Sequence, residues 1–330
     1  MAEKRKLRVA AIGVGSLGRH HARNYAQMAA EGRVELVGVC DTSAETAAEI
    51  GGKHACGIFD DWRKLIGKVE AVSIATPTES HCEIACAFLE KGVHVLVEKP
   101  ICITLDEADR MIAVGAKSGA KLMVGQLERF NPAMIALRPH ITTPLYFEIH
   151  RVSPFPNRSL DVDVVLDVMI HDLDAVAWLV GDVDASEIKA VGVPVISDKV
   201  DTANARIEFD NGAVANITAS RVGAGKVRKT RFFQPDSYVV LDYGEKTAAI
   251  TTLDHNPAHP FAAMQVKKLD VVDVEPLRAE LTAFLDSIEN NTSVPVTGED
   301  GRRALELAVA VTEDIQRHLD RLGLAQKMGG

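Results

Sequence analysis

Short hydrophobic runs alternate with amphipathic segments between residues 7 and 125 of the chain. Each run is mostly apolar and does not alternate regularly, which is typical of a strand buried on both faces of a parallel sheet, whereas the segments between them carry apolar residues at helical spacing. The predicted strands are Leu7–Ile12, Val34–Cys40, Ala71–Ala75, Val93–Glu98 and Lys121–Gly125. This repetition of strand and helix, with a short predicted helix at Asp60–Ile66, predicts a doubly wound α/β sheet of Rossmann type.

Beyond residue 125 apolar and polar residues alternate instead. Ala203–Phe209 and Ala213–Ala219 flank Asp210-Asn211-Gly212, and Asn-Gly between two alternating segments is a strong hairpin signal. The remaining predicted strands are Leu145–Val152, Ser186–Val193, Arg231–Phe233 and Tyr238–Tyr243, and the predicted helices are Pro132–Leu137, Val164–Val180, Pro276–Asn290 and Glu299–Leu322.

Two domains follow from this change of pattern. We predict a Rossmann domain over residues 1–125 and an α+β domain with an open, mostly antiparallel sheet over residues 126–330, whose last two helices are able to pack back on the first domain. One face of such a sheet stays available for a second copy of the chain, so we expect a homodimer or homotetramer.

Composition excludes several classes of partner. The net charge of −9 over 330 residues disfavours binding to nucleic acid or to an anionic membrane surface. The chain has no apolar run of the roughly 18 residues that a transmembrane helix needs, and its start leads directly into a strand, so a cytoplasmic location is expected. The five cysteines lack a CxxC pair. We interpret them as reduced core thiols and expect no metal site.

A glycine turn joins the first predicted strand to the helix that follows it. In this pattern the first glycine permits a tight turn, the second lets the backbone approach a pyrophosphate, and the third lets the helix pack on the strand. The second strand ends on an acid about twenty residues later, where a carboxylate accepts hydrogen bonds from an adenosine ribose. The predicted dinucleotide site consists of Gly13, Gly15, Ser16, Leu17, Gly18 and Asp41.

Asp41 also bears on the choice of dinucleotide. Its carboxylate repels a 2′-phosphate, and neither Thr42 nor Ser43 supplies an arginine to neutralise one. We therefore predict NAD in preference to NADP. Asp41 also suits the N-cap of a helix that begins at Ala44, and the two roles are compatible.

Two further strand ends carry polar side chains, and ligands of open parallel sheets bind at the carboxyl ends of strands. Thr76 and Pro77 follow the third strand and are placed to line the nicotinamide ribose. His81 either contacts the cofactor or lies in the next helix as a structural residue. The fourth strand ends in Glu98-Lys99-Pro100, which makes Lys99 a catalytic candidate. The alternative is a surface lysine in a turn that ends a strand.

A third candidate group lies in the predicted helix Val164–Val180. Asp167 and His171 are four residues apart and share a face of that helix. An acid in this position orients an imidazole and favours its charged form, which suits a general base. Asp174 is the alternative partner of His171, and a structural histidine is the alternative role.

Taken in order, these motifs resemble the Gfo/Idh/MocA family of sugar and cyclitol oxidoreductases, and the resemblance covers nearly the whole chain. It implies an NAD-dependent hydride transfer in which Lys99 contacts the reacting hydroxyl, His171 exchanges its proton and Asp167 holds sugar hydroxyls. The motifs that carry it are the glycine turn, Asp41, Thr76-Pro77 with His81, Glu98-Lys99-Pro100, Gly125-Gln126 with Arg129-Phe130, and Asp167 with His171. Together they give cofactor contacts at Thr76, Pro77, His81, Glu98, Lys99 and Gln126 and a substrate contact at Arg129.

Basic residues indicate the substrate class. Arg151 and Arg158 bracket a segment before the predicted helix, and Arg221, Lys226, Arg228, Lys229 and Arg231, the basic cluster, crowd a glycine-containing stretch. Arginine forks match phosphate oxygens, so Arg151, Arg158 and Arg221 are candidates for binding the diphosphate of a nucleotide sugar; a solvated basic loop is the alternative.

The residue pattern around Arg151 and before His171 also resembles the family branch that oxidises UDP-N-acetylglucosamine at its 3-hydroxyl, a step toward amino sugars of lipid A. The alternatives are an inositol or free-sugar dehydrogenase, an NAD-assisted glycosidase that shows no net NADH formation, and a non-catalytic sugar or NAD sensor. The presence of both Lys99 and His171 favours a dehydrogenase over a sensor.

Overall fold

The computed structural model describes residues 5–155, 162–254 and 263–324 of the chain. It divides into two compact units, of which the first joins Met1–Leu127 with Pro276–Arg302 and the second joins Glu128–Glu275 with Arg303–Gly330. The C-terminal region is therefore shared between the two units. Within the described ranges no helix is both long and apolar enough to cross a membrane.

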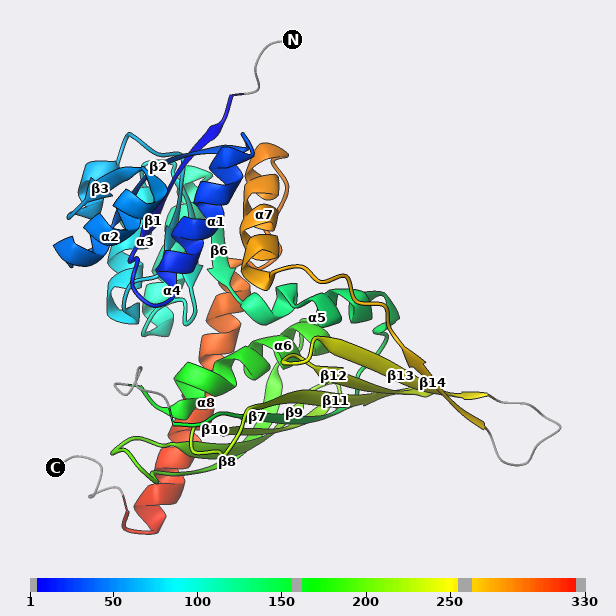
Figure 1. Ribbon diagram of the computed structural model, residues 1–330. Helices are drawn as coiled ribbons and strands as arrows, with labels where there is room; N and C mark the ends of the chain where they lie inside the picture. The colour runs from blue at the N-terminus through cyan, green and yellow to red at the C-terminus, as the bar shows by residue number, and fades with distance from the viewer. Residues whose placement is uncertain (1–4, 156–161, 255–262, 325–330) are drawn as a thin grey trace. The chain divides into compact units, whose positions relative to one another are not determined.

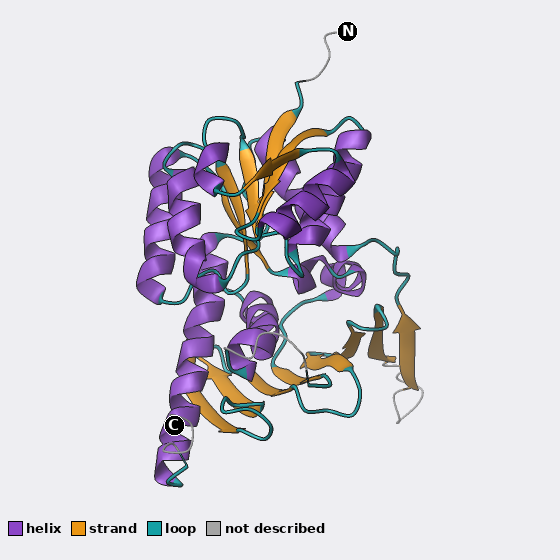
Figure 2. Ribbon diagram, turned by 60° about the vertical axis from the view of Figure 1, so that its left-hand side comes forward, coloured by secondary structure: helices purple, strands orange, loops and turns teal. Residues whose placement is uncertain are grey.

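The first unit contains a six-stranded parallel sheet in the order β3-β2-β1-β4-β5-β6, which confirms the predicted doubly wound fold. Helices lie on both sides of this sheet (Figure 2). The strands are β1 (Leu7–Ile12), β2 (Val34–Cys40), β3 (Gly57–Phe59), β4 (Ala71–Ile74), β5 (His94–Glu98) and β6 (Leu122–Gly125), and the helices are α1 (Gly18–Ala30), α2 (Ala44–His54), α3 (His81–Leu89), α4 (Leu105–Ser118) and α7 (Pro276–Glu289). In place of the predicted helix around Asp60–Ile66 the structure has a shorter 3-10 helix over Trp62–Leu65.

Strand burial explains why these runs are mostly apolar. Every residue of β4 and of β6 is buried, and so are the last four residues of β1. Helix α7 lies beside α1 (Figure 1), where Arg33 donates a hydrogen bond of 2.5 Å to Asp286 and Arg278 pairs with Glu31. All six strands are parallel, so the loops that follow their carboxyl ends meet at one edge of the sheet.

The second unit contains an eight-stranded sheet in the order β14-β13-β12-β11-β7-β10-β9-β8. Its neighbouring strands are antiparallel except for β7 and β10, and the predicted hairpin is confirmed as β9 and β10. The strands are β7 (Tyr146–Val152), β8 (Ala185–Val193), β9 (Thr202–Phe209), β10 (Val214–Ser220), β11 (Val227–Gln234), β12 (Ser237–Asp242), β13 (Thr247–Asp254) and β14 (Ala263–Lys268), and the helices are α5 (Pro132–Leu137), α6 (Ile170–Val180) and the part of α8 (Gly298–Arg321) beyond Arg302.

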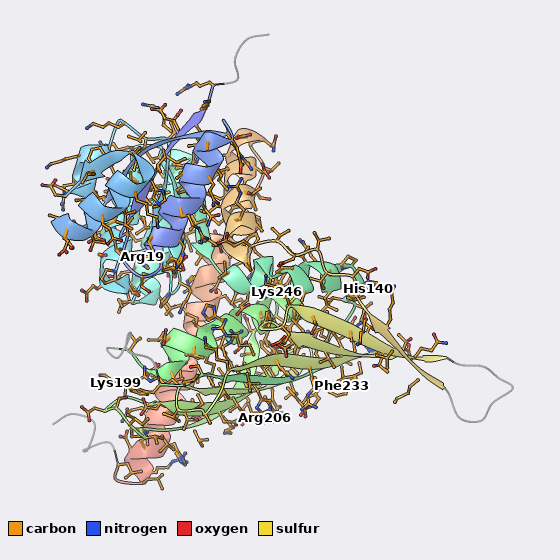
Figure 3. The ribbon with its side chains drawn as sticks, in the orientation of Figure 1. Arg19, His140, Lys199, Arg206, Phe233 and Lys246 are labelled. Carbon is orange, nitrogen blue, oxygen red and sulfur yellow. The ribbon has the colours of Figure 1, made fainter. Side chains whose placement is uncertain are left out.

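The two faces of this sheet differ. On one face Phe147 and Phe232 are fully buried in a core that also holds residues of α5, α6 and α8. On the other face the rings of Tyr146, Phe233 and Tyr238 stack in a row, with ring centroids 5.6 Å and 4.8 Å apart. Figure 3 shows Phe233 on the side of the sheet away from α5 and α6. The second face is thus open and partly aromatic, as the alternating pattern predicts.

Candidate functional site

The glycine turn after β1 is tight at its ends and open in its middle. Gly13 has φ +75°, and a Cβ there would lie 2.7 Å from the backbone of Ala75. A Cβ on Gly18 would lie 1.6 Å from the carbonyl oxygen of Gly13, whereas a Cβ on Gly15 would meet no heavy atom within 4 Å. Only glycine fits the two ends, and the open middle leaves room for a ligand against the backbone.

The helix that follows this turn begins without a side-chain cap. Leu17, the N-cap of α1, makes no side-chain capping bond, and the first turn of α1 holds no acidic residue. Ser16 and Leu17 are exposed beside it. An anionic group is stabilised at such an end because the positive end of the helix dipole faces it.

Asp41 lies beside this turn at the end of β2. Its Oδ2 accepts a hydrogen bond of 2.8 Å from the backbone N–H of Val14, and its Oδ1 accepts one of 2.9 Å from that of Ser43. Ser43, whose hydroxyl accepts from the N–H of Thr46, is the N-cap of α2. The predicted capping role of Asp41 is therefore wrong, because its carboxylate instead ties the end of β2 to the glycine turn.

His81 connects the loops after β4 and β5. Its Nε2 lies 3.0 Å from the carbonyl oxygen of Thr76, and its Nδ1 lies 3.0 Å from that of Pro100. The side chain is buried at the start of α3, and this burial lowers the pKa of His81 below its usual value. Thr76 and Pro77 themselves lie at the loop surface. His81 thus holds both loops from beneath, at the same edge of the sheet as the glycine turn.

The end of β5 carries a chain of contacts that leads to Lys99. Glu98 is buried, its Oε1 lies 3.0 Å from Nε2 of His21, and its Oε2 accepts a hydrogen bond of 3.3 Å from the backbone N–H of Lys99. A Cβ on Gly125 would lie 3.0 Å from this carboxyl group. The Lys99 side chain is half-buried at the strand end. The structure therefore gives Glu98, a predicted cofactor contact, a role in fixing the backbone of the candidate lysine.

Gln126, the first residue after β6, provides a further sign of a ligand. It is 1% exposed, yet its Oε1 has no hydrogen-bond partner among the described residues. A buried amide oxygen without a donor is costly. Together with the open space at Gly15 and the uncapped start of α1, it indicates that this edge fits a dinucleotide. The residues that would hold it are Gly13, Gly15, Ser16, Leu17, Gly18, Asp41, Thr76, Pro77, Lys99 and Gln126.

In the second unit, the predicted regular helix around Asp167 and His171 is wrong in one respect. Residues Val165–Met169 form a π-helical turn, and α6 begins only at Ile170. Asp163 starts the turn by accepting hydrogen bonds of 2.9 Å and 3.0 Å from two of its backbone N–H groups, and burial raises the pKa of this carboxyl. Asp167 and His171 are both half-buried. Short π-helical turns inside helices occur frequently at functional sites.

Two buried ion pairs flank His171. Asp172 accepts two hydrogen bonds of 2.8 Å from Arg151, which also donates one of 2.6 Å to Glu128. Asp174 accepts hydrogen bonds of 2.8 Å and 2.6 Å from Arg129. These bidentate pairs fasten the first turn of α6 to β7 and to the segment after β6. Arg129 and Arg151, predicted substrate contacts, therefore have structural partners within the unit.

The basic cluster is not a single loop, because residues 227–234 form β11. Arg221 is fully buried and pairs with Asp201 at 2.9 Å. Although burial opposes ionisation, hydrogen bonds from Ser197 and from backbone N–H groups lower the pKa of Asp201 well below its usual range. Arg221 is thus held in the interior, and we no longer expect it to bind phosphate. Arg158 lies outside the described residues.

Three residues that support the site were not predicted from the sequence. The first is His21, which is buried, and the available signal was a histidine three residues after the last glycine of the turn. Glu128 and Asp172 were missed because nothing in sequence reveals which charges become buried. In the described part of the chain, no three or more His, Cys, Asp or Glu side chains form a group that could hold a metal.

The comparisons with known proteins bear on both units. A family profile described as an oxidoreductase family with an NAD-binding Rossmann fold matches residues 7–126, and the Gfo/Idh/MocA C-terminal domain matches residues 141–239. The chain is also 37% identical over 316 residues to UDP-N-acetylglucosamine 3-dehydrogenase of Acidithiobacillus ferrooxidans, covering 96% of this chain and 99% of that protein. This chain belongs to the Gfo/Idh/MocA oxidoreductase family.

Solved structures agree with this membership. A structure of the Acidithiobacillus dehydrogenase superposes with a TM-score of 0.89 and covers 96% of this chain and 99% of its own. A levoglucosan dehydrogenase in complex with NADH and levoglucosan shares the fold, with a TM-score of 0.84 at 22% identity over 95% of this chain and 98% of its own. Among more distant Gfo/Idh/MocA relatives, inositol 2-dehydrogenase of Rhizobium meliloti is 25% identical over 94% of this chain and 97% of its own. The protein is accordingly an NAD-binding oxidoreductase of this family.

Proposed function

We propose that this protein oxidises the 3-hydroxyl of a UDP-linked amino sugar, with UDP-N-acetylglucosamine as the substrate, to the 3-keto sugar. The observation that carries the proposal is the 37% identity to UDP-N-acetylglucosamine 3-dehydrogenase over nearly the full length of both proteins. The more distant inositol dehydrogenases match at 25% identity. The chemistry at the end of β5 and the start of α6 suits either substrate, so the choice rests on the nearer relative.

The proposed roles follow from charge and placement. When bound, NAD supplies the acceptor for the hydride from the reacting carbon. Lys99 places positive charge where the hydroxyl oxygen gains negative charge, which lowers the cost of deprotonation. His171 accepts the hydroxyl proton as general base, and Asp167 holds neighbouring sugar hydroxyls. The buried pairs at Asp172 and Asp174 keep the first turn of α6, and with it His171, in place.

NAD in preference to NADP is the second part of the proposal. It is supported by the Asp41 carboxylate, which two backbone N–H groups hold at the end of β2 beside the glycine turn. A 2′-phosphate brought to that carboxylate meets like charge. Titration of the protein with NADH and NADPH tests this, and equal or tighter binding of NADPH contradicts it.

We also propose that the open face of the eight-stranded sheet joins copies of the chain into a dimer or tetramer. Its support is the aromatic row of Tyr146, Phe233 and Tyr238, in which Phe233 is exposed and the two tyrosines are half-buried. Such rings supply apolar area to an interface. Light scattering of the purified protein checks the mass, and a Phe233→Lys variant is expected to shift the assembly toward monomer. A monomeric wild-type protein contradicts this proposal.

The substrate proposal is tested by NADH formation from NAD with UDP-N-acetylglucosamine, its galacto epimer, free N-acetylglucosamine, myo-inositol and glucose. Turnover confined to the UDP sugars supports it, and turnover of myo-inositol or glucose alone overturns it. Loss of turnover in Lys99→Ala and His171→Ala, with NADH binding retained, supports the assigned roles. Consumption of a glycoside without net NADH points instead to an NAD-assisted glycosidase.

A further inference from the structure

The basic cluster divides into residues with and without partners once the strands are in place. Arg221 is buried against Asp201. Lys229 pairs with Asp242 at 3.4 Å, and Arg231 pairs with Glu148 at 3.1 Å. The Arg228 side chain is exposed and makes no hydrogen bond or ion pair with any residue that the structure describes. Lys226 precedes the first residue of β11, so the strand register does not fix the face on which it lies.

Register places Arg228 and its neighbours on opposite faces of the sheet. Arg228 is directly opposite Arg151 of β7, while Lys229 is opposite His150 and Arg231 is opposite Glu148. Directly opposite residues of antiparallel strands point to the same face, and successive residues alternate between faces. Arg151 points to the face that α6 covers, because it binds Asp172 of α6. Arg228 therefore lies on the α6 face, and Lys229 and Arg231 lie on the open face.

Asp172 links Arg228 to the candidate base. Burial raises the pKa of this carboxyl, and the charges of Arg151 and Arg228 both act to lower it, so Arg228 is close enough for its charge to be felt there. His171 is the residue directly before Asp172 in the first turn of α6. The unpartnered guanidinium and the imidazole thus lie near the same buried carboxylate.

The ion pairs of Arg151 explain why Arg228 remains available for a ligand. The carboxylates of Asp172 and Glu128 are both held on Arg151, which removes the repulsion that two adjacent guanidiniums would otherwise have. They leave the donors of Arg228 unused. A guanidinium with a planar fork of N–H donors matches a phosphate bidentately.

We propose that Arg228 binds a phosphate of the nucleoside diphosphate sugar, whereas Lys229 and Arg231 of the same basic cluster do not. This inference rests on the proposed function. In such a substrate the first phosphate is attached to carbon 1 of the sugar ring that carries the reacting hydroxyl. A residue that binds it must therefore lie close to the residue that takes the hydroxyl proton, as Arg228 does through Asp172.

The test compares Arg228→Gln with the matched variant Arg231→Gln, which removes an identical charge from the same strand on the opposite face. Loss of a hydrogen bond to a charged group predicts a KM for UDP-N-acetylglucosamine about tenfold higher or more in Arg228→Gln, with kcat less affected, and a value within about twofold of wild type in Arg231→Gln. Arg228→Lys is expected to recover part of the loss, because it restores charge without the fork. Thermal unfolding and NADH affinity are expected to match wild type in all three variants.

Binding of UDP alone, measured by calorimetry, separates this inference from the proposed function. Wild-type turnover of the sugar panel reports on the function, and UDP affinity in wild type and Arg228→Gln reports on Arg228. A UDP affinity about tenfold weaker in Arg228→Gln but unchanged in Arg231→Gln supports the inference even if another sugar proves to be the substrate. Equal UDP affinity and equal KM in Arg228→Gln and wild type overturn it, as does an equal loss in both glutamine variants.

Discussion

Gly15 and Gly18 allow the ligand site at the glycine turn to be separated from the stability of the first unit. A Cβ on Gly18 would lie 1.6 Å from the carbonyl oxygen of Gly13, but a Cβ on Gly15 would have no heavy atom within 4 Å. Neither glycine has a φ in the left-handed region, so alanine brings no backbone strain at either position. We therefore expect Gly18→Ala to destabilise the fold and Gly15→Ala to weaken only the binding of NAD.

The magnitudes follow from these distances. Close carbon–oxygen contacts lie at about 3.3–3.6 Å, so the backbones at Gly13 and Gly18 must separate by nearly 2 Å, and overpacking of this kind costs about 1–3 kcal/mol or more. For a folding unit of about 150–250 residues, which is the size of the first unit, each kcal/mol lowers the melting temperature by about 2–4 °C. Gly15→Ala restricts only the unfolded chain and is expected to change stability by no more than about 1 kcal/mol. Its methyl group fills the space open to a pyrophosphate, and a loss of about 1.4 kcal/mol corresponds to a tenfold weaker NADH affinity.

Thermal unfolding of both variants without cofactor, and NADH titration of both by fluorescence, check this reasoning. A melting temperature of Gly18→Ala equal to that of wild type contradicts the clash. Wild-type NADH affinity in Gly15→Ala refutes the assignment of the open middle of the turn to the pyrophosphate. Loss of stability in Gly15→Ala refutes it as well, because the structure gives that methyl group nothing to displace.

Three further predictions concern buried groups. Arg151→Met leaves two buried carboxylates without their cation and is expected to lower the free energy of unfolding by about 3–5 kcal/mol in chemical denaturation. The control variant Arg206→Met, at a surface ion pair, is expected to lower it by at most about 1 kcal/mol. Similar losses in both variants contradict the burial argument. Burial lowers the pKa of His81 below the value of about 6.5 in the unfolded chain, so the unfolded state binds more protons and stability falls as the pH drops from 7 to 5. The free energy of unfolding is expected to change with pH by up to about 1.4 kcal/mol per pH unit, and this slope is expected to shrink in His81→Gln. An unchanged slope in the variant refutes the role of this ring. Burial raises the pKa of the Cys102 thiol to about 12, and it also raises the pKa of Cys56. Because Cys56 is only half-buried whereas Cys102 is buried, iodoacetamide is expected to modify Cys56 first. Peptide mass spectrometry that finds Cys102 modified first contradicts this.

The Rossmann sheet was predictable because its strands are buried on both faces. Such strands are mostly apolar, and β1, β2, β4, β5 and β6 all have that signature. The three-residue β3 is too short to give a pattern. In the second unit, β13 contains several Ala and Thr residues and few large apolar ones, so alternation along it is weak. Its pairing with β12 and β14 comes from the neighbouring strands and not from its own composition.

The positions of the candidate site residues in the fold could be predicted better than their contacts. The glycine turn, Asp41 and Lys99 are found at the ends of strands, where the alternation of strand and helix places them. The π-helical turn at Val165–Met169 could not be foreseen, because its backbone hydrogen bonds leave the apolar spacing of a helix unchanged. The same limit applies to Asp41, whose position suits a helix cap although Ser43 fills that role.

Charged residues were the hardest to assign, and the reason is physical. Arg151, Arg221 and Arg228 look equivalent in sequence, but a buried guanidinium is tolerated only with carboxylates around it, whereas an exposed one needs none. Arg151 forms ion pairs with two carboxylates and Arg221 with one, so both arginines have a structural role. Only Arg228 is both exposed and without a described partner on the face that carries His171. In this protein a direct ion pair with an acid therefore marks an arginine as structural, and the lack of a described pair marks the arginine that is available to bind an anionic substrate.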